Sequence, residues 1–180
     1  MSNRKYVLTT MEENVFLITI DHPPVNTLNL QTLSELESAV DEFTANPTCK
    51  VAIIAGGDKA VFVSGADIKE SAELTASGKV KDFILQGQEL FRKISECSKP
   101  IIAAINGLAL GGGMELAMAC HLRIMADRAK LAQPEINLGI IPGWGGTRML
   151  PQIVGCAKAR ELILTGESIS ALEAFRLNLV

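Results

Sequence analysis

The chain has 180 residues, 48% of them hydrophobic, so it is long enough to bury a sizeable core and has an ordinary globular composition. Its net charge of -3 argues against general nucleic-acid binding, which favours a basic face, but not against an anionic ligand held by a few lysines. No run approaches the roughly 18 apolar residues of a membrane span. The N-terminus has no signal or transit pattern. We therefore expect one domain over residues 1–180, in the cytoplasm.

The four cysteines are scattered and form no CxxC pair. Together with the lack of a signal sequence, this predicts buried, reduced thiols. Two histidines and four dispersed cysteines have no metal-ligand spacing, so we expect no metal site. The cysteines are Cys49, Cys97, Cys120 and Cys156.

In chain order, short apolar runs alternate with amphipathic segments. The expected strands are 6–9, 15–20, 51–55 and 101–105. Helices are expected after a cap at Asn29, over 79–96 and over 157–164. In the second of these, the residues expected to face inward are Val80, Phe83, Ile84, Leu90, Phe91 and Ile94. Strands that alternate with helices predict an α/β fold.

The first segment whose residues suit a catalytic or binding site has a glycine between a β-branched run and a helix-like stretch. A glycine there lets the backbone turn sharply, and the next amides then lie at a helix N-terminus without intrahelical partners. An ordinary strand-to-helix turn with a cap near Asp67 explains the same pattern. The segment contains Ser64, Gly65, Ala66, Asp67, Ile68 and Lys69.

The second segment contains three consecutive glycines, Gly111 to Gly113, before a helix-forming stretch. Such a run indicates close backbone approach or unusual dihedrals, and it places free amides beside a cavity. Glu115 follows in the first helical turn among apolar neighbours. Its carboxylate is either a partner of the helix dipole or a general acid or base whose pKa is raised. The residues leave both interpretations open.

The third segment, over 133–147, carries Glu135 directly after a proline, then a second glycine cluster that includes Gly143. A surface glutamate at a helix start is the simpler interpretation, but few polar residues surround it. Neither GxGxxG with a ribose-binding acid nor a GxxxxGK[ST] loop is present, so no nucleotide motif competes.

Together these segments resemble the enoyl-CoA hydratase/isomerase (crotonase) family. SGADIKE resembles its first oxyanion segment, NGLALGGGMELAMAC its second, and QPEINLGIIPGWGGTRMLP its second catalytic-glutamate segment. HPPVNTLN and LTGESISALEA also match in kind and order, so the resemblance covers nearly the whole chain. It implies a spiral of ββα units whose strands form two roughly perpendicular sheets.

The resemblance also implies roles for individual residues. The amides of Ala66 and Gly112 would form an oxyanion hole for the thioester carbonyl. Glu115 would help activate a water for attack at C3 of a 2-enoyl-CoA, and Glu135 would protonate C2. Gly143 matches a position whose backbone lies near that water. The implied activity is therefore an enoyl-CoA hydratase of fatty acid β-oxidation or related acyl-CoA metabolism.

Further residues are expected along the substrate. Lys59 and Lys69 flank the first oxyanion segment and would meet the phosphates of coenzyme A, unless they are solvated surface lysines. Trp144 either borders the acyl pocket or is simply packed in its glycine-rich bend. His121 stands where the family usually has aspartate, and we interpret it as structural because it follows a helix. The remaining expected contacts are Ser64, Gly65, Asp67, Ile68 and Gly111.

Three alternatives remain open. An enoyl-CoA isomerase needs only one of the two glutamates, and a truncated chain would bind acyl-CoA without turnover. A serine protease of the related ClpP-like fold would need a histidine partner, and only His22 and His121 are present.

The resemblance sets expectations for cofactors and assembly as well. Coenzyme A is part of the substrate, and no further cofactor is implied. Family members usually continue with helices that drive trimer packing, so we expect these to be largely absent here. The family otherwise predicts a homo-oligomer, a trimer or a hexamer.

Overall fold

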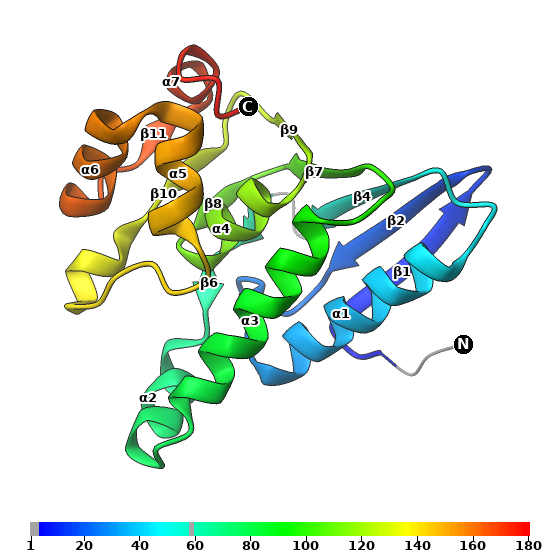
Figure 1. Cartoon of the computed structure of the whole chain (residues 1–180), viewed down its shortest axis with the longest axis horizontal. Helices are drawn as coiled ribbons and strands as arrows, with labels where there is room; N and C mark the ends of the chain where they lie inside the picture. The colour runs from blue at the N-terminus through cyan, green and yellow to red at the C-terminus, as the bar shows by residue number, and fades with distance from the viewer. Residues whose placement is uncertain (1–3, 58–59) are drawn as a thin grey trace.

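The computed structural model describes residues 4–57 and 60–180, and it contains two larger β-sheets covered by helices (Figure 1). The first sheet has the strand order β1-β2-β4-β7-β9. Only the β1–β2 pair is antiparallel; the other neighbours run parallel. Its strands are β1 (Val7–Glu12), β2 (Val15–Ile20), β4 (Val51–Gly56), β7 (Ile101–Ile105) and β9 (Leu122–Met125).

The second sheet has the order β11-β10-β8-β5, and a separate two-stranded ladder joins β3 to β6. The ladder is short, but it aligns the segment before α1 with the first glycine turn. These strands are β5 (Val61–Val63), β8 (Leu108–Leu110), β10 (Lys130–Ala132), β11 (Ile169–Ser170), β3 (Thr27–Leu28) and β6 (Gly65–Ala66).

Seven α-helices and one 3-10 helix are described. Among them, none is long and apolar enough to cross a bilayer. The helices are α1 (Leu30–Ala45), α2 (Ile68–Ala76), α3 (Val80–Ser95), α4 (Gly112–Ala119), η1 (Pro134–Leu138), α5 (Gly146–Val154), α6 (Cys156–Thr165) and α7 (Ala171–Arg176).

Most of the predicted elements are confirmed. β2 and β7 have the predicted bounds, and Asn29 caps α1 by accepting a 2.8 Å bond from the Thr32 amide. β1 is longer than predicted. Its polar end has no apolar alternation to reveal it, but it pairs residue by residue with β2, from Val7 opposite Ile20 to Glu12 opposite Val15.

Helix α4 lies at the centre of the molecule, where every one of its residues is buried. It contacts α3, α5 and the strands β5, β6 and β8. A helix covered on all sides needs no polar face, which fits its apolar sequence. Any charged side chain on α4 is therefore carried into the interior.

Two predictions about burial need correction. The four thiols are free, as predicted, and Cys49 and Cys120 are buried, but Cys97 is half-buried and Cys156 is exposed. Cys156 begins α6 on the outer face of that helix, so it is not part of the core. In α3, Val80 and Ile84 are only half-buried, because the face that meets the core runs through Phe83, Gly87, Leu90, Phe91 and Ile94.

Candidate active site

The first glycine turn is built as predicted, between a strand and a helix. Leu28 of β3 pairs with Ala66 of β6, and the Asp67 amide donates a 3.0 Å bond to the Leu28 carbonyl. Gly65 has φ +106°, a conformation that favours glycine. Asp67 caps α2, since its Oδ1 accepts bonds from the Lys69 and Glu70 amides at 3.0 and 3.1 Å. The cap interpretation of Asp67 is therefore confirmed.

The glycine run meets this turn. Gly111 has φ +52° and precedes Gly112, the first residue of α4, whose opening amides have no partner within the helix. A Cβ built on Gly112 would lie 3.6 Å from the Ala66 nitrogen, and one on Gly65 would lie 3.7 Å from the Gly112 nitrogen. Two segments more than forty residues apart thus bring the amides of Ala66 and Gly112 side by side.

Glu115 lies one helical turn into α4, with only 1% of its surface exposed. Its Oε1 accepts a 2.8 Å bond from the Trp144 amide and a 2.7 Å bond from the Gly146 amide. Burial raises the pKa of Glu115 to about 7; the nearby charge of Glu135 adds to the rise, and the two amides oppose it. This carboxylate changes its charge near neutral pH.

Glu135 lies in η1 and is 8% exposed. Burial raises its pKa above the ordinary value. A Cβ on Gly111 would lie 2.9 Å from its Oε1, so the carboxylate sits against the glycine turn. Within residues 4–57 and 60–180, its buried Oε2 has no hydrogen-bond partner. A buried oxygen of this kind is suited to exchange a proton with a ligand.

Two buried polar residues for which the sequence predicted no role lie beside the glycine-rich segments. Gln133 donates from Nε2 to the Gly111 carbonyl at 3.1 Å, and it is fully buried. Asn26 accepts a 2.9 Å bond from the His22 amide and donates to the carbonyls of Val61 and Phe62 at 3.2 Å. Both lie inside motifs that resemble the family, and this was the one feature of the sequence that could have indicated a role for them.

The glycine-rich bend after η1 carries the two other predicted residues. Gly143 is half-buried, and its carbonyl accepts a 2.8 Å bond from Gln88 Nε2. The Trp144 ring packs edge-to-face against Phe83 and Phe91, with centroids 5.3 and 5.6 Å away. The tryptophan is therefore packed in the bend, and its contact with an acyl group stays a prediction.

The remaining predicted contacts lie at the edge of the site. Ser64 is half-buried, whereas Ile68 and Lys69 are exposed in the first turn of α2. Lys59 lies outside the described residues. His121 follows α4 and accepts a 3.0 Å bond at Nδ1 from the Ile101 amide, so its structural role is confirmed.

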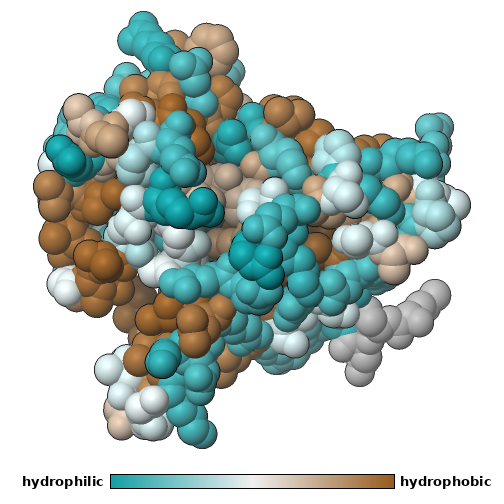
Figure 2. Space-filling view, in the orientation of Figure 1, coloured by the Kyte–Doolittle hydropathy of each residue, from teal (hydrophilic) through white to brown (hydrophobic). Residues whose placement is uncertain are grey.

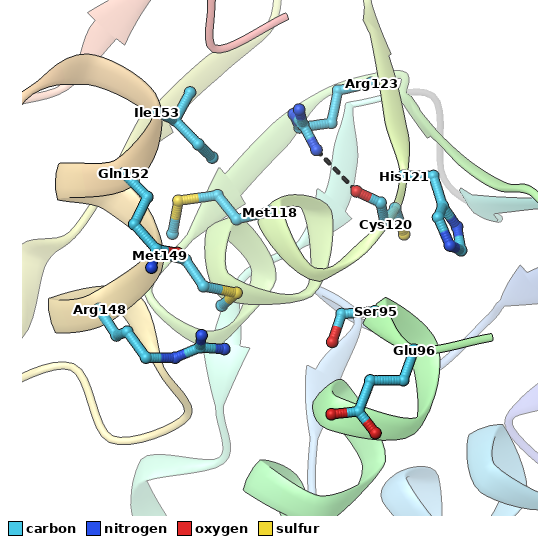
Figure 3. A pocket seen from close by; sticks show the side chains of 10 residues that line it. All are labelled: Ser95, Glu96, Met118, Cys120, His121, Arg123, Arg148, Met149, Gln152 and Ile153. Carbon is cyan, nitrogen blue, oxygen red and sulfur yellow. Dashed lines mark hydrogen bonds between the residues drawn. The ribbon is translucent and has the colours of Figure 1, made fainter.

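A cavity of about 410 Å³ lies away from these groups, between the ends of α3 and α4, β9 and α5 (Figure 3). Arg123, one of the polar side chains that line it, already serves the fold, since it donates to the carbonyls of Cys120 and Leu179, each at 2.7 Å. Burial raises the pKa of the Cys120 thiol to about 12, which leaves it unreactive. Neither Glu115 nor Glu135 lines this cavity.

Comparison with known proteins assigns the chain to a family. A profile of the Enoyl-CoA hydratase/isomerase family matches residues 10–180, so the chain belongs to this family. A probable enoyl-CoA hydratase of Bacillus subtilis (strain 168) is 49% identical over 94% of the chain and 66% of its own length. A crotonyl-CoA hydratase of Syntrophomonas wolfei subsp. wolfei is 45% identical over 97% of the chain and 67% of its own length.

Solved structures confirm the fold. An enoyl-CoA hydratase of Bacillus anthracis superposes with a TM-score of 0.93 at 36% identity, over 98% of this chain and 69% of that one. One from Geobacillus kaustophilus HTA426 gives a TM-score of 0.95 at 32% identity, over 99% and 68%. The predicted crotonase-like α/β fold is thus confirmed. The chain spans about two thirds of the length of the curated relatives it matches.

Proposed function

We propose that the chain adds water across the 2,3 double bond of a 2-enoyl-CoA thioester. The observation that carries this proposal is the placement of two buried glutamates, Glu115 and Glu135, beside the adjoining amides of Ala66 and Gly112. Relatives named enoyl-CoA hydratase and crotonyl-CoA hydratase, at 42–49% identity, support the same activity.

The two amides would bind the thioester oxygen. As water attacks C3, the electrons of the double bond move toward the carbonyl, and negative charge develops on that oxygen. Fixed backbone donors at that position stabilise the charge, and one such donor is typically worth about 10²–10³ in rate. Gly112 supplies its amide from the start of a buried helix, where the helix dipole adds to the effect.

The two glutamates would divide the proton transfers. Glu115, whose charged form is stabilised by the amides of Trp144 and Gly146, accepts a proton from the attacking water. Glu135, whose raised pKa favours the protonated form, gives its proton to C2. The hydroxyl group then stands on C3 and a hydrogen on C2. One proton has moved from water to Glu115, and exchange between the pair or with solvent restores the starting state.

The coenzyme A moiety would approach from the side of α2. Lys69 is exposed there, in the first helical turn, where an ammonium group can reach a diphosphate. We propose the same contact with the coenzyme A phosphates for Lys59. Water addition and proton transfer need no redox cofactor, so coenzyme A enters only as part of the substrate.

One observation favours isomerase as a second candidate. Oε1 of Glu115 already accepts two backbone bonds, so this carboxylate can serve to hold the bend after η1. Glu135 alone, with its unpartnered Oε2 among the described residues, would then move a proton between two carbons of an enoyl-CoA.

We also propose that the protein works as a homo-oligomer in the cytoplasm. The four free thiols fit a reducing compartment. Large apolar side chains gather on the surface of η1 and the loop after it (Figure 2). Ile141, in this loop, is 70% exposed. Such a patch is typical of an interface, and a monomeric mass in solution at micromolar concentration would contradict this. The exposed members are Ile136, Leu138, Ile140 and Ile141.

The test is the loss of the conjugated enoyl-thioester absorbance of crotonyl-CoA. We expect the wild type to turn over, and Glu115→Gln and Glu135→Gln each to lose about 10²–10⁴ in kcat, the usual contribution of a general acid or base. Glu167→Gln, at an exposed position, is the matched control and should keep full activity. A wild type that leaves the absorbance unchanged would favour the isomerase role, because the conjugated thioester is the favoured product of isomerisation. Full activity in both variants would refute the proposal.

A further inference from the structure

The Trp144 indole fills the space between helices α3 and α4. A Cβ built on Gly87 would lie 2.3 Å from its Nε1, and one on Gly112 would lie 2.4 Å from its Cζ3. Phe83 and Phe91 hold the ring edge-to-face, and only 5% of the residue is exposed. The ring therefore sits in a slot that exists because both helices carry glycine where they face it.

This slot lies beside the proposed reacting groups. The Gly112 position that abuts the six-membered ring of the indole is also 3.6 Å from the Ala66 nitrogen. The backbone amide of Trp144 itself donates to Glu115 Oε1 at 2.8 Å. The indole thus contacts Gly112, which carries one predicted oxyanion donor. The backbone amide of the same tryptophan holds the carboxylate of Glu115.

An acyl chain would have to pass this ring. With the carbonyl oxygen at the amides of Ala66 and Gly112, and C3 beside Glu115, the carbons beyond C3 would run toward the indole that adjoins Gly112, into the space between α3 and α4. That space is apolar, lined by Phe83, Phe91 and the indole, and the indole fills it. A short acyl group ends before the ring, whereas a longer one must displace it.

We propose that Trp144 is the end wall of the acyl pocket and limits the enzyme to short-chain enoyl-CoA thioesters. This inference rests on the proposed function, because it takes the substrate's position from the amides and the two glutamates. Trp144 is a specificity-determining residue in this proposal, and Gly87 is the residue that makes room for it.

The test compares four-carbon crotonyl-CoA with ten-carbon trans-2-decenoyl-CoA in wild type, Trp144→Leu and Trp144→Phe. We expect the wild type to prefer the short substrate by about 100-fold or more in kcat/KM. Trp144→Leu should raise the long-to-short ratio by at least about tenfold, the scale of a few methylenes in an apolar pocket. Trp144→Phe should shift it less. It keeps an aromatic ring in the cluster and gives the answer if Trp144→Leu does not fold, as checked by circular dichroism.

Phe43→Leu is the matched control. It loosens another buried aromatic pair, Phe43 with Phe16, and leaves the indole against Gly112, so the ratio should stay at the wild-type value. A tryptophan that only stabilises the fold would lower kcat/KM for both substrates equally in Trp144→Leu and Trp144→Phe, and that result would overturn the proposal. A wild type that accepts both chain lengths equally would overturn it too.

Binding separates this inference from the proposed reaction. The dissociation constants of butyryl-CoA and decanoyl-CoA, saturated thioesters that cannot be hydrated, are measured by calorimetry for the same variants. If no variant turns over but the affinity ratio shifts toward decanoyl-CoA in Trp144→Leu, the hydration proposal fails and the end wall stands. If turnover is present but neither ratio shifts, the hydration proposal stands and the end wall is refuted.

Discussion

The carboxylate of Glu115 is held inside the molecule, where, among the described residues, two backbone amides donate to it. Its pKa of about 7, against an ordinary value of 4.5, means that the folded chain keeps this proton where the unfolded chain releases it. Below pH 4.5 both states are protonated, and the group has no effect on stability. As pH rises toward 7, the free energy of unfolding falls, and above pH 7 the full loss is roughly 3 kcal/mol.

The Glu115→Gln variant should remove this pH dependence, because its amide oxygen still accepts the two bonds but carries no charge. We expect the stability of the variant relative to wild type to improve by roughly 2 kcal/mol between about pH 5 and pH 8. Urea unfolding at the two pH values measures it. A difference between variant and wild type that stays constant with pH would show that Glu115 titrates at its ordinary pKa when folded.

At the scale of single residues, the sequence pointed to the two buried carboxylates more clearly than to the residues that support them. Glu115 and Glu135 are the acidic residues of motifs with few other polar side chains, so their burial could be inferred. Gln133 and Gly87 could not be found in this way. The role of each depends on a partner far along the chain, Gly111 for Gln133 and Trp144 for Gly87, and no local pattern encodes that contact.

Among the helices, α3 contains a glycine at its buried centre, where glycine costs about 1 kcal/mol relative to alanine. Because a Cβ at Gly87 would lie 2.3 Å from Trp144 Nε1, we expect Gly87→Ala to destabilise the protein by about 1–3 kcal/mol, despite the better helix propensity of alanine. In a Trp144→Leu background the same change should be stabilising. Urea unfolding of the double-mutant cycle measures both effects.

Lys81→Ala is the control for this cycle, since Lys81 is exposed near the start of α3 and should be close to neutral in both backgrounds. If Gly87→Ala stabilised the wild type as much as it stabilised the Trp144→Leu variant, the indole would not occupy the slot beside α3. The end wall of the acyl pocket would then lose its structural basis.

Elements with a strong apolar period were the ones the sequence predicted well. The helix after Asn29 and the strands 15–20 and 101–105 each bury one clear face or a short apolar run. Two-residue strands such as β3 and β6 carry no such pattern, since they are defined by pairing across the chain. They are nevertheless what aligns Ala66 with the glycine run.

Across the whole molecule, the site is assembled from three segments, one of which is the start of the buried helix α4. The turn after β6 supplies Ala66, the start of α4 supplies Gly112 and Glu115, and η1 with the bend after it supplies Glu135 and Trp144. The family resemblance predicted this convergence, whereas periodicity alone indicated only an α/β fold. Figure 1 shows β6 and α4, which are far apart in sequence, side by side near the centre of the structure.

The central claim is that this chain adds water to an enoyl-CoA, and the most direct measurement follows the oxygen of that water. Crotonyl-CoA is incubated with the protein in water labelled with oxygen-18, and the product is analysed by mass spectrometry, with Glu115→Gln and Glu135→Gln beside the wild type. We predict 3-hydroxybutyryl-CoA with the label on C3 from the wild type and almost none from either variant. In a parallel incubation the protein is given 3-butenoyl-CoA. Its conversion to crotonyl-CoA, with no labelled product in either incubation, would contradict the account and assign the site to isomerisation.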